Sequence, residues 1–452
     1  MVKLALYLAL LASVLMLSKA PWIAALVYSI VSVMQPQYIW FWAFEGFSAF
    51  KFAAGVSIIA WIWHAMQGNI RWEVYRTGQF KGMFVLLIIF HLSNFLTPFA
   101  SYFSLVSGDL VVSIFTTIFV MYFIVLPLIN DENTIKFFGF MYIFIVVYYA
   151  YWANDHYLSN NWGQFSQGRL MGPRGSPYAD GNITSIVLTS GLGFVMFGAR
   201  YFPQKWLKYG LLLTIPFIWH ALILFASRGA LLSAAAVTLF FAMVVKSRVL
   251  NIAIAFGFVG MLVWQGGMLT QRTNNTVSQA QSSNSEAPLN PRLVSWSVGI
   301  DIALEYPLLG AGPQRFQYAS RQLYPGKSPH VAHNTFLNFS ANTGLIAGFI
   351  YLSFFWVSFK QYRFVKKRVR ENSIFDYINL SCMSGLVGYF VGAFFLDLII
   401  FEPFYFLLIL MSANYVLMKN STNTDALLQE QPIDKKMKNQ FTRNQHNKPG
   451  IS

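Results

Sequence analysis

The sequence predicts an all-α integral membrane protein, a bundle of about a dozen transmembrane helices with a long loop on the outer face. Three observations lead to this fold class. Hydrophobic residues make up 56% of the 452 residues and charged residues only 11%, against about 25% charged in soluble domains. Apolar runs long enough to cross a bilayer recur along the chain. Basic residues gather in alternate connections between these runs, as the positive-inside rule requires.

The predicted spans cover most of the first 418 residues, which we expect to form one transmembrane domain. They lie at 49–66, 82–100, 107–128, 136–153, 182–199, 208–225, 229–246, 250–265, 336–358, 377–397 and 400–418. Residues 3–34 are also apolar but are interrupted by "SKAPW". They form either one kinked crossing, which puts the N-terminus inside, or two half-spans. Met1–Ala20 has the character of a signal peptide, but apolar sequence resumes after Pro21, so we expect a retained first segment.

The basic residues assign the sides of the membrane. If every span crosses once, one side holds Arg71, Arg76, Lys81, Arg200, Lys205, Lys208, Lys246, Arg248, Lys360, Arg363, Lys366, Lys367, Arg368, Arg370, Lys435, Lys436, Lys438 and Arg443. This side is predicted to be the cytoplasm. The same sorting argues against nucleic-acid binding as the reason for the net charge of +15. Residues 419–452 form a basic cytoplasmic tail whose composition predicts disorder.

Two long connections, about 154–181 and 266–335, fall on the outer side. In the second, "PRLVSWSVGIDIALEYPLLG" predicts an amphipathic helix on the bundle or at the membrane interface. Pro291 suits a helix start, and Pro307 with Gly310 ends the pattern. Trp296, Ile300 and Leu304 fall on one predicted face.

The outer connections are poor in cations, and those present are almost all arginine. They are Arg169, Arg174, Arg228, Arg272, Arg292, Arg315 and Arg321, with Lys327 as the exception. One guanidinium group can donate two parallel hydrogen bonds to phosphate oxygens. The preference for arginine over lysine on this side therefore predicts a phosphate-bearing ligand. The alternative is interfacial snorkelling and loop ion pairs.

Arg228 is the strongest of these candidates. It lies in "ILFASRGALLSAAA", between two apolar spans. A charge at that depth costs several kcal/mol unless it has a partner, and its default interpretation is functional. In "GRLMGPRGSPYADGNITS", Asp180 or Asn182 is expected to cap the following helix, whereas Arg169 and Arg174 have no such structural explanation.

Two histidines stand in "GKSPHVAHNTFLNFSANTG", at the start of an apolar run. A metal site would need a further ligand beside His330 and His333, and no nearby cluster supplies one; Cys382 is the chain's one cysteine and lies in an apolar segment. The remaining interpretations are a hydrogen-bonded interfacial histidine and a general base. We favour His333 as the base because it directly precedes the predicted helix. Asn334 would then orient it or bind sugar.

Three segments in order, "ASRGALLS", "PRLVSWSVGIDIALEYPLLGAGPQRF" and "AHNTFLNFSANTGLIAG", resemble the O-antigen ligase and polymerase superfamily. The likeness covers the C-terminal two-thirds of the chain, and the N-terminal third is similar only in hydropathy. One departure concerns a glutamate that many members carry after the histidine. Here Asn342 stands near that place. The sequence therefore favours His333 over a carboxylate as the catalytic group.

The resemblance implies transfer of a glycan from undecaprenyl diphosphate to an acceptor hydroxyl outside the bacterial inner membrane, as in lipopolysaccharide biosynthesis. It implies no cofactor or metal and a lipid A core acceptor in ligases. Arg228 takes the place of the family's helix-mouth arginine, and Arg174 or Arg169 that of a second diphosphate contact. His333 takes the place of the loop histidine. Arg292, Arg315, Arg321 and His330 are candidate loop or acceptor contacts.

Other functions remain open at this stage. A polymerase would pass the glycan to a second lipid-linked glycan, and a protein O-oligosaccharyltransferase to a protein. A flippase for lipid-linked glycans also needs phosphate-binding arginines, but it should place ionisable groups near the bilayer midplane. This sequence places its notable ones at the outer lip.

Overall fold

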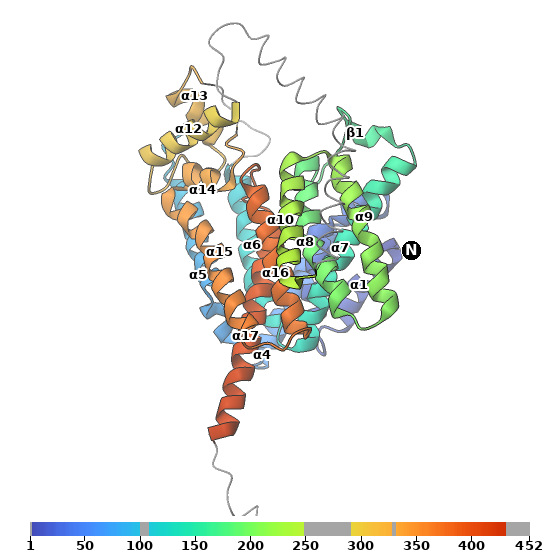
Figure 1. The fold of residues 1–452 in the computed structure, drawn as a ribbon. Helices are drawn as coiled ribbons and strands as arrows, with labels where there is room; N and C mark the ends of the chain where they lie inside the picture. Colours follow the sequence, from blue (N-terminus) through green and yellow to red (C-terminus); the bar gives the residue numbers. More distant parts are fainter. Residues whose placement is uncertain (1, 100–107, 248–290, 328–330, 431–452) are drawn as a thin grey trace, which may run out of the picture.

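The computed structural model describes residues 2–99, 108–247, 291–327 and 331–430, and this part of the chain forms an all-α bundle (Figure 1). Its α-helices are α1 Val2–Leu15, α2 Trp22–Met34, α3 Pro36–Ile39, α4 Ala49–Met66, α5 Gly78–Phe95, α6 Gly108–Leu128, α7 Glu132–Leu158, α8 Gly181–Tyr201, α9 Lys205–Phe225, α10 Arg228–Val245, α12 Pro291–Glu305, α13 Phe316–Leu323, α14 Thr335–Thr343, α15 Leu345–Lys366, α16 Ile374–Ala393 and α17 Glu402–Glu430. Short 3-10 turns are η1 Phe41–Ala43, η2 Trp72–Arg76 and η3 Trp162–Gln164, and β1 Phe165–Ser166 pairs with β2 Arg169–Leu170 as a small hairpin.

Multiple helices are suited to crossing a membrane, as the sequence predicted. Among the described residues, eight are long and apolar enough: α4 to α10 and α16. The predicted span 250–265 lies outside the described residues. The structure therefore supports a multi-pass membrane protein, without reaching the predicted count of spans.

The centre of the bundle is the contact between α8 and α16, where small residues allow close approach. A Cβ on Gly193 of α8 would lie 1.7 Å from Ser384 Oγ, and one on Gly385 of α16 would lie 2.4 Å from the Ser190 carbonyl oxygen. A larger residue at either position would therefore force the two helices apart. Helix α10 packs against both α8 and α16.

Residues 3–34 form a helical hairpin. The Tyr7 hydroxyl of α1 donates to the Ala43 carbonyl, which follows α2, and Lys3 lies 4.9 Å from the centre of the Trp42 ring. The chain therefore returns to the end from which α1 starts. Residues 3–34 are thus two shorter apolar helices, as in the second of the two predicted alternatives.

The predicted span 336–358 is also two helices, because the chain bends at Gly344 between α14 and α15. Gly344 has a φ of +92°, and a Cβ there would lie 2.2 Å from the Leu308 carbonyl oxygen. The Leu345 amide donates to the Pro307 carbonyl at 2.8 Å. The segment after α12 thus packs into the bend and separates α14 from the span.

The helix predicted from Pro291 is confirmed as α12, but its buried face differs from the predicted one. Val298 and Ile302 are fully buried against α13 and α14, whereas Ile300 is 47% and Leu304 64% exposed. Helix α12 therefore has apolar residues on two faces. The face with Val298 and Ile302 packs against the rest of the protein, and the face with Ile300 and Leu304 is exposed. In Figure 1, α12, α13 and α14 gather at one end of the bundle, called the loop end from here on.

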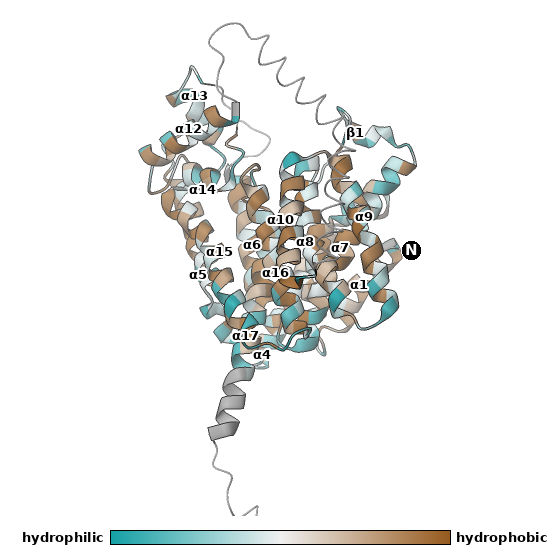
Figure 2. Ribbon diagram, viewed as in Figure 1, coloured by the Kyte–Doolittle hydropathy of each residue, from teal (hydrophilic) through white to brown (hydrophobic). Residues whose placement is uncertain are grey.

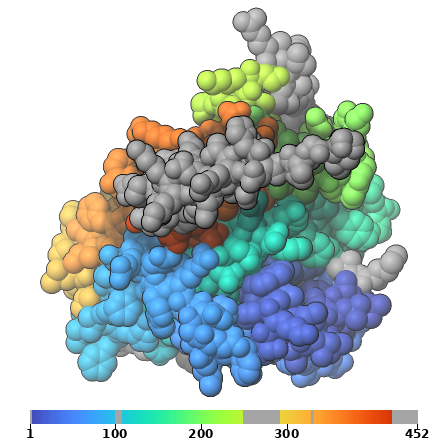
Figure 3. All heavy atoms as spheres, turned by 90° about the horizontal axis from the view of Figure 1, so that it is seen from below, coloured from blue at the N-terminus to red at the C-terminus, as the bar shows by residue number. Residues whose placement is uncertain are grey.

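The opposite end, called the basic end, brings the predicted basic connections together. Lys366 pairs with Asp376 at 3.1 Å, and Arg200 Nε donates to Asn372 Oδ1 at 3.0 Å. Hydrophilic residues concentrate here beneath the mainly apolar helices (Figure 2). Viewed onto this end, the blue N-terminal segments lie beside the teal ones (Figure 3). Helix α17 continues to Glu430, so the first part of the predicted disordered tail is helical.

Candidate functional site

Arg228 is the first residue of α10, at the loop end. Ala226 has a left-handed φ of +49°, and the Ser227 hydroxyl caps the helix by accepting from the Ala230 amide at 3.4 Å. The turn therefore fixes the backbone and leaves the Arg228 side chain exposed. A Cβ on Gly229 would lie 3.2 Å from Phe395 Cβ, so this turn packs against the connection between α16 and α17.

Arg292, on α12 in the long outer connection, has an exposed side chain like that of Arg228. Partial desolvation, and then the positive charge of Arg228, lower the pKa of Arg292. Like charges that interact in this way repel each other, and a bound anion would relieve that repulsion. Arginines on α10 and α12 are therefore candidates for one anion site, to which each could donate paired hydrogen bonds.

Arg169 and Arg174, left as alternatives by the sequence, lie in different surroundings. Arg169 Nε donates to the Phe225 carbonyl at 3.2 Å, and its Nη2 donates to Asn182 Oδ1 at 2.7 Å. It therefore braces the turn that presents Arg228. Arg174 is exposed and donates to the Gly163 carbonyl. Asp180 caps α8 as predicted, accepting from the Asn182 amide at 2.8 Å.

His333 precedes α14 at the loop end, with a left-handed φ of +46° and a half-buried side chain. Asn334 is the helix cap, because its Oδ1 accepts from the Leu337 amide at 3.1 Å. This hydrogen bond caps α14, and it helps to fix the backbone at His333, the residue before Asn334. His330 lies outside the described residues, as does Arg272.

Asp397 lies beside the start of α14 and was missed by the sequence reasoning. Thr335 Oγ1 donates to the Leu396 carbonyl at 2.8 Å and accepts from the Leu398 amide at 3.1 Å, so it brackets Asp397 on both sides. Burial raises the pKa of Asp397, while hydrogen bonds from the Asn338 side chain and from Ile399 act in the opposite direction. An acidic residue within the apolar run "FFLDLIIF" was the available signal.

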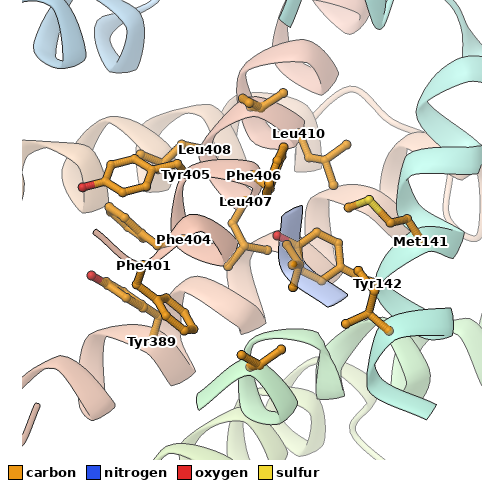
Figure 4. Close-up of a cluster of buried hydrophobic side chains, with 14 of the residues drawn as sticks. Met141, Tyr142, Tyr389, Phe401, Phe404, Tyr405, Phe406, Leu407, Leu408 and Leu410 are labelled. Carbon is orange, nitrogen blue, oxygen red and sulfur yellow. The ribbon is translucent and has the colours of Figure 1, made fainter. Parts of the chain in front are cut away.

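The connection that carries Asp397 is held by aromatic residues. The Tyr389 hydroxyl donates to the Leu398 carbonyl at 3.2 Å, and the Tyr405 hydroxyl donates to the Ile399 carbonyl at 2.5 Å. The rings of Tyr389 and Phe404 stack with their centres 4.2 Å apart. Figure 4 shows these rings lying together with Phe401 at the start of α17. The aromatic cluster therefore fixes the segment facing α14.

Arg315 has a structural position rather than one beside Arg228. It is buried at the start of α13, and its Nη1 donates to Asn94 Oδ1 at 2.9 Å. Asn94 Nδ2 in turn donates to Asp109 Oδ1 at 2.6 Å. Arg315 therefore fastens α13 to α5 and α6. Arg321 lies exposed in the last turn of α13.

Asn342, which stands near the expected glutamate, also takes part in local structure. Its Oδ1 accepts from the Phe316 amide at 2.9 Å, and its Nδ2 donates to Asn338 Oδ1. Through Asn338 it connects to Asp397, so the loop end does hold a carboxyl group beside α14. Among the described residues, no cluster of three or more His, Cys, Asp or Glu has the arrangement of a metal site.

Comparison with known families agrees with the resemblance seen in the sequence. Residues 213–352 match the family model described as O-Antigen ligase. The match begins in α9 and ends in α15, and it includes Arg228, Arg292 and His333. No curated protein matches the chain. Asp397 lies beyond the matched residues, beside the start of α14, which they contain.

Proposed function

We propose that this chain, which carries an O-antigen ligase family domain at residues 213–352, is a membrane glycan transferase that uses a lipid-linked donor. The single observation that carries the proposal is the match of residues 213–352 to the O-Antigen ligase family model, a segment that contains Arg228, Arg292 and His333. The donor would be a glycan on undecaprenyl diphosphate. The preferred acceptor is a hydroxyl of the lipid A core.

In the proposed reaction, the acceptor oxygen attacks the anomeric carbon as the bond from that carbon to the diphosphate oxygen breaks. Configuration at the carbon is inverted. The diphosphate leaves with both electrons of the broken bond, and Arg228 and Arg292 stabilise its growing negative charge. Arg169 supports Arg228 through the turn at Phe225. Arg174 remains a candidate contact to the diphosphate or the sugar.

His333 would accept the proton from the attacking hydroxyl. Asp397, on the connection facing the start of α14, would stabilise the positive charge that His333 then gains. No step in this scheme uses a metal or cofactor. The site would face the periplasm, with the basic end in the cytoplasm of the bacterial inner membrane, as the charge distribution favours.

The test uses the full chain purified in detergent, an undecaprenyl diphosphate-linked glycan and EDTA. With lipid A core added, one discrete glycan block on the core is expected, and the His333→Ala variant should fail to form it while still reaching the membrane. A ladder without added acceptor would indicate a polymerase, and transfer to a protein an O-oligosaccharyltransferase. If no transfer occurs but reconstituted vesicles move the donor across the bilayer, the chain is a flippase.

A further inference from the structure

Glu402 is an acidic residue that the proposed reaction does not use. It is the first residue of α17. Its Oε2 atom accepts hydrogen bonds from the Ser32 hydroxyl of α2 at 2.5 Å and from the hydroxyl of Tyr178, in the connection between α7 and α8, at 3.4 Å. Ser32 and Tyr178 are almost fully buried, so this oxygen lies inside the bundle. A buried carboxyl group is costly, and in a membrane protein it indicates a function.

Tyr178 is held firmly within the α7–α8 connection. Its carbonyl oxygen accepts from Thr184 Oγ1 at 2.5 Å, and a Cβ on Gly172 would lie only 1.8 Å from the same oxygen. The Gly172 amide donates to the Ala179 carbonyl at 2.9 Å. The connection is thus closed on itself around Tyr178, and the hydrogen bond to Glu402 attaches this whole part of it to α17.

The α7–α8 connection also supports the Arg228 turn. Leu170 in this connection is fully buried, and a Cβ on Gly181 would lie 2.4 Å from its carbonyl oxygen. Arg169, directly before Leu170, donates from Nε to the Phe225 carbonyl at 3.2 Å. That carbonyl lies three residues before Arg228, so a displacement of the connection would be transmitted to Arg228.

On its other side, Glu402 follows the connection that carries Asp397. The Tyr178 ring lies edge-on to the ring of Phe401, the residue before Glu402, with centres 6.0 Å apart. Phe401 in turn stacks on Tyr389 with centres 5.8 Å apart, and this tyrosine donates a hydrogen bond to the Asp397 connection. Tyr178 therefore meets that connection through a ring contact as well as through the Glu402 carboxyl group.

We infer that Glu402 is a positioning residue, which fixes the turn that presents Arg228 relative to Asp397 and the start of α14; this rests on the proposed function. The donor and the acceptor hydroxyl must be aligned for transfer, and a misplacement of about 1 Å can slow such a reaction about 10²-fold. Glu402, Ser32 and Tyr178 all lie outside the family match. Segments outside the matched residues thus contribute to the geometry of the site.

The kinetic test uses substitutions that remove one hydrogen-bonding group each. Tyr178→Phe removes the hydroxyl and keeps the ring, and Glu402→Leu removes the acceptor. Both should lower kcat for glycan transfer by about tenfold or more, with KM for the donor nearly unchanged because the arginines are retained. Glu402→Gln keeps an oxygen that can accept from both hydroxyl groups, so its kcat should stay close to that of the unmodified chain.

Tyr142→Phe is the matched control. The Tyr142 hydroxyl donates to the Pro403 carbonyl at 2.7 Å, next to Glu402, but it comes from α7 rather than from the α7–α8 connection. The substitution therefore removes a buried tyrosine hydroxyl from the same helix start, and it should leave kcat unchanged.

Spin labels measure the position of the α7–α8 connection without any substrate. They are attached at Ser166→Cys in β1 and Ile346→Cys in α15, both exposed positions, in a chain with Cys382→Ser. Helix α15 packs against α16 and α17, so the labels report the distance from the connection to these helices. The distance distribution should broaden in Tyr178→Phe and stay narrow in the control variant.

An unchanged distance distribution in Tyr178→Phe and Glu402→Leu, or a broadened one with unchanged kcat, would overturn the inference. An equal loss of kcat in Tyr142→Phe would also overturn it, because the effect would then be one of general stability. If the unmodified chain transfers no glycan, it is the proposed function that fails, since the labels test the attachment through Glu402 without substrate.

Discussion

At the scale of single residues, the structure separates arginines that the sequence treats alike. Arg315 donates a hydrogen bond to Asn94 and so holds α13 in place. Arg169 donates a hydrogen bond to the Phe225 carbonyl. Arg228 is exposed at a helix start, and its charge lowers the pKa of Arg292. Composition predicts an anion-binding face, but only the three-dimensional contacts show which guanidinium groups hold the protein together.

Arg228→Lys tests whether the forked shape matters as well as the charge. Lysine keeps the positive charge but loses the paired donors. Because removal of one preorganised donor to a developing anion costs roughly 10²- to 10³-fold in rate, we expect kcat/KM for glycan transfer to fall by about that factor. The measurement is the initial rate with the undecaprenyl donor. Arg71→Lys, at an exposed position in the connection before α5, is the control, and an equal loss there would show that the effect is not specific to Arg228.

Asp397→Asn should lower activity and raise stability. In the proposed mechanism Asp397 stabilises the protonated His333, so we expect transfer to fall about 10²-fold when its charge is lost. Burial raises the pKa of Asp397, so the folded state binds this proton more tightly than the unfolded state. Ionisation of Asp397 therefore destabilises the fold as pH rises above the ordinary carboxyl pKa of about 3.9.

The asparagine variant cannot ionise, so its apparent Tm should exceed that of the unmodified chain at neutral pH. The difference should shrink as the pH approaches 4. Thermal unfolding in detergent across this pH range measures it. A lower Tm for the variant at every pH would show that the Asp397 carboxylate is a structural partner instead.

At the scale of elements, the bends and caps of the loop end depend on contacts far apart in sequence. The sequence predicts one span over 336–358 because its hydropathy is continuous there. Gly344 breaks that span because the Leu308 carbonyl occupies the space beside it, and no periodicity reports a contact of that kind. The helical pattern of the sequence likewise predicts α12. Contacts with α13 and α14, however, determine which of its faces is buried.

Gly344→Ala should destabilise the loop end. The added Cβ would lie 2.2 Å from the Leu308 carbonyl oxygen, and the φ of +92° disfavours any L side chain. A cost of at least 1–3 kcal/mol is expected from the backbone conformation alone. Gly210→Ala on α9 is the control, because a Cβ there meets nothing within 4 Å and alanine favours a helix. Equal apparent Tm values for the two variants would contradict this account.

At the scale of the whole molecule, the structure brings basic residues from connections far apart in the sequence to one end. Arg200, Lys366 and their acidic or amide partners meet at the basic end, while the candidate site assembles at the loop end. The sequence predicts this separation because local charge decides it. The sequence does not predict Asp397 as a site residue, because its position beside α14 depends on how α16 and α17 are connected.

The N-terminal hairpin changes one prediction about the whole molecule. If residues 3–34 crossed once, both termini would lie in the cytoplasm. The structure instead returns the chain to Ala43, next to Tyr7, before α4 begins. Near the tip of the hairpin, the Trp22 ring stacks on Phe137 in the second turn of α7, with centres 5.2 Å apart, which places the tip toward the basic end. The start of α1 therefore lies on the side where α4 begins.

We therefore expect the two termini to lie on opposite sides of the membrane. Epitope tags at either end, probed in intact and permeabilised cells with an impermeant protease, measure this. The N-terminal tag should be cleaved in cells whose outer barrier alone is opened, and the C-terminal tag only after full permeabilisation. A cysteine at Ser297 on α12, in a chain with Cys382→Ser, should react like the N-terminal tag. Protection of the N-terminal tag together with labelling of the cysteine would show that residues 3–34 cross once, against the hairpin seen here.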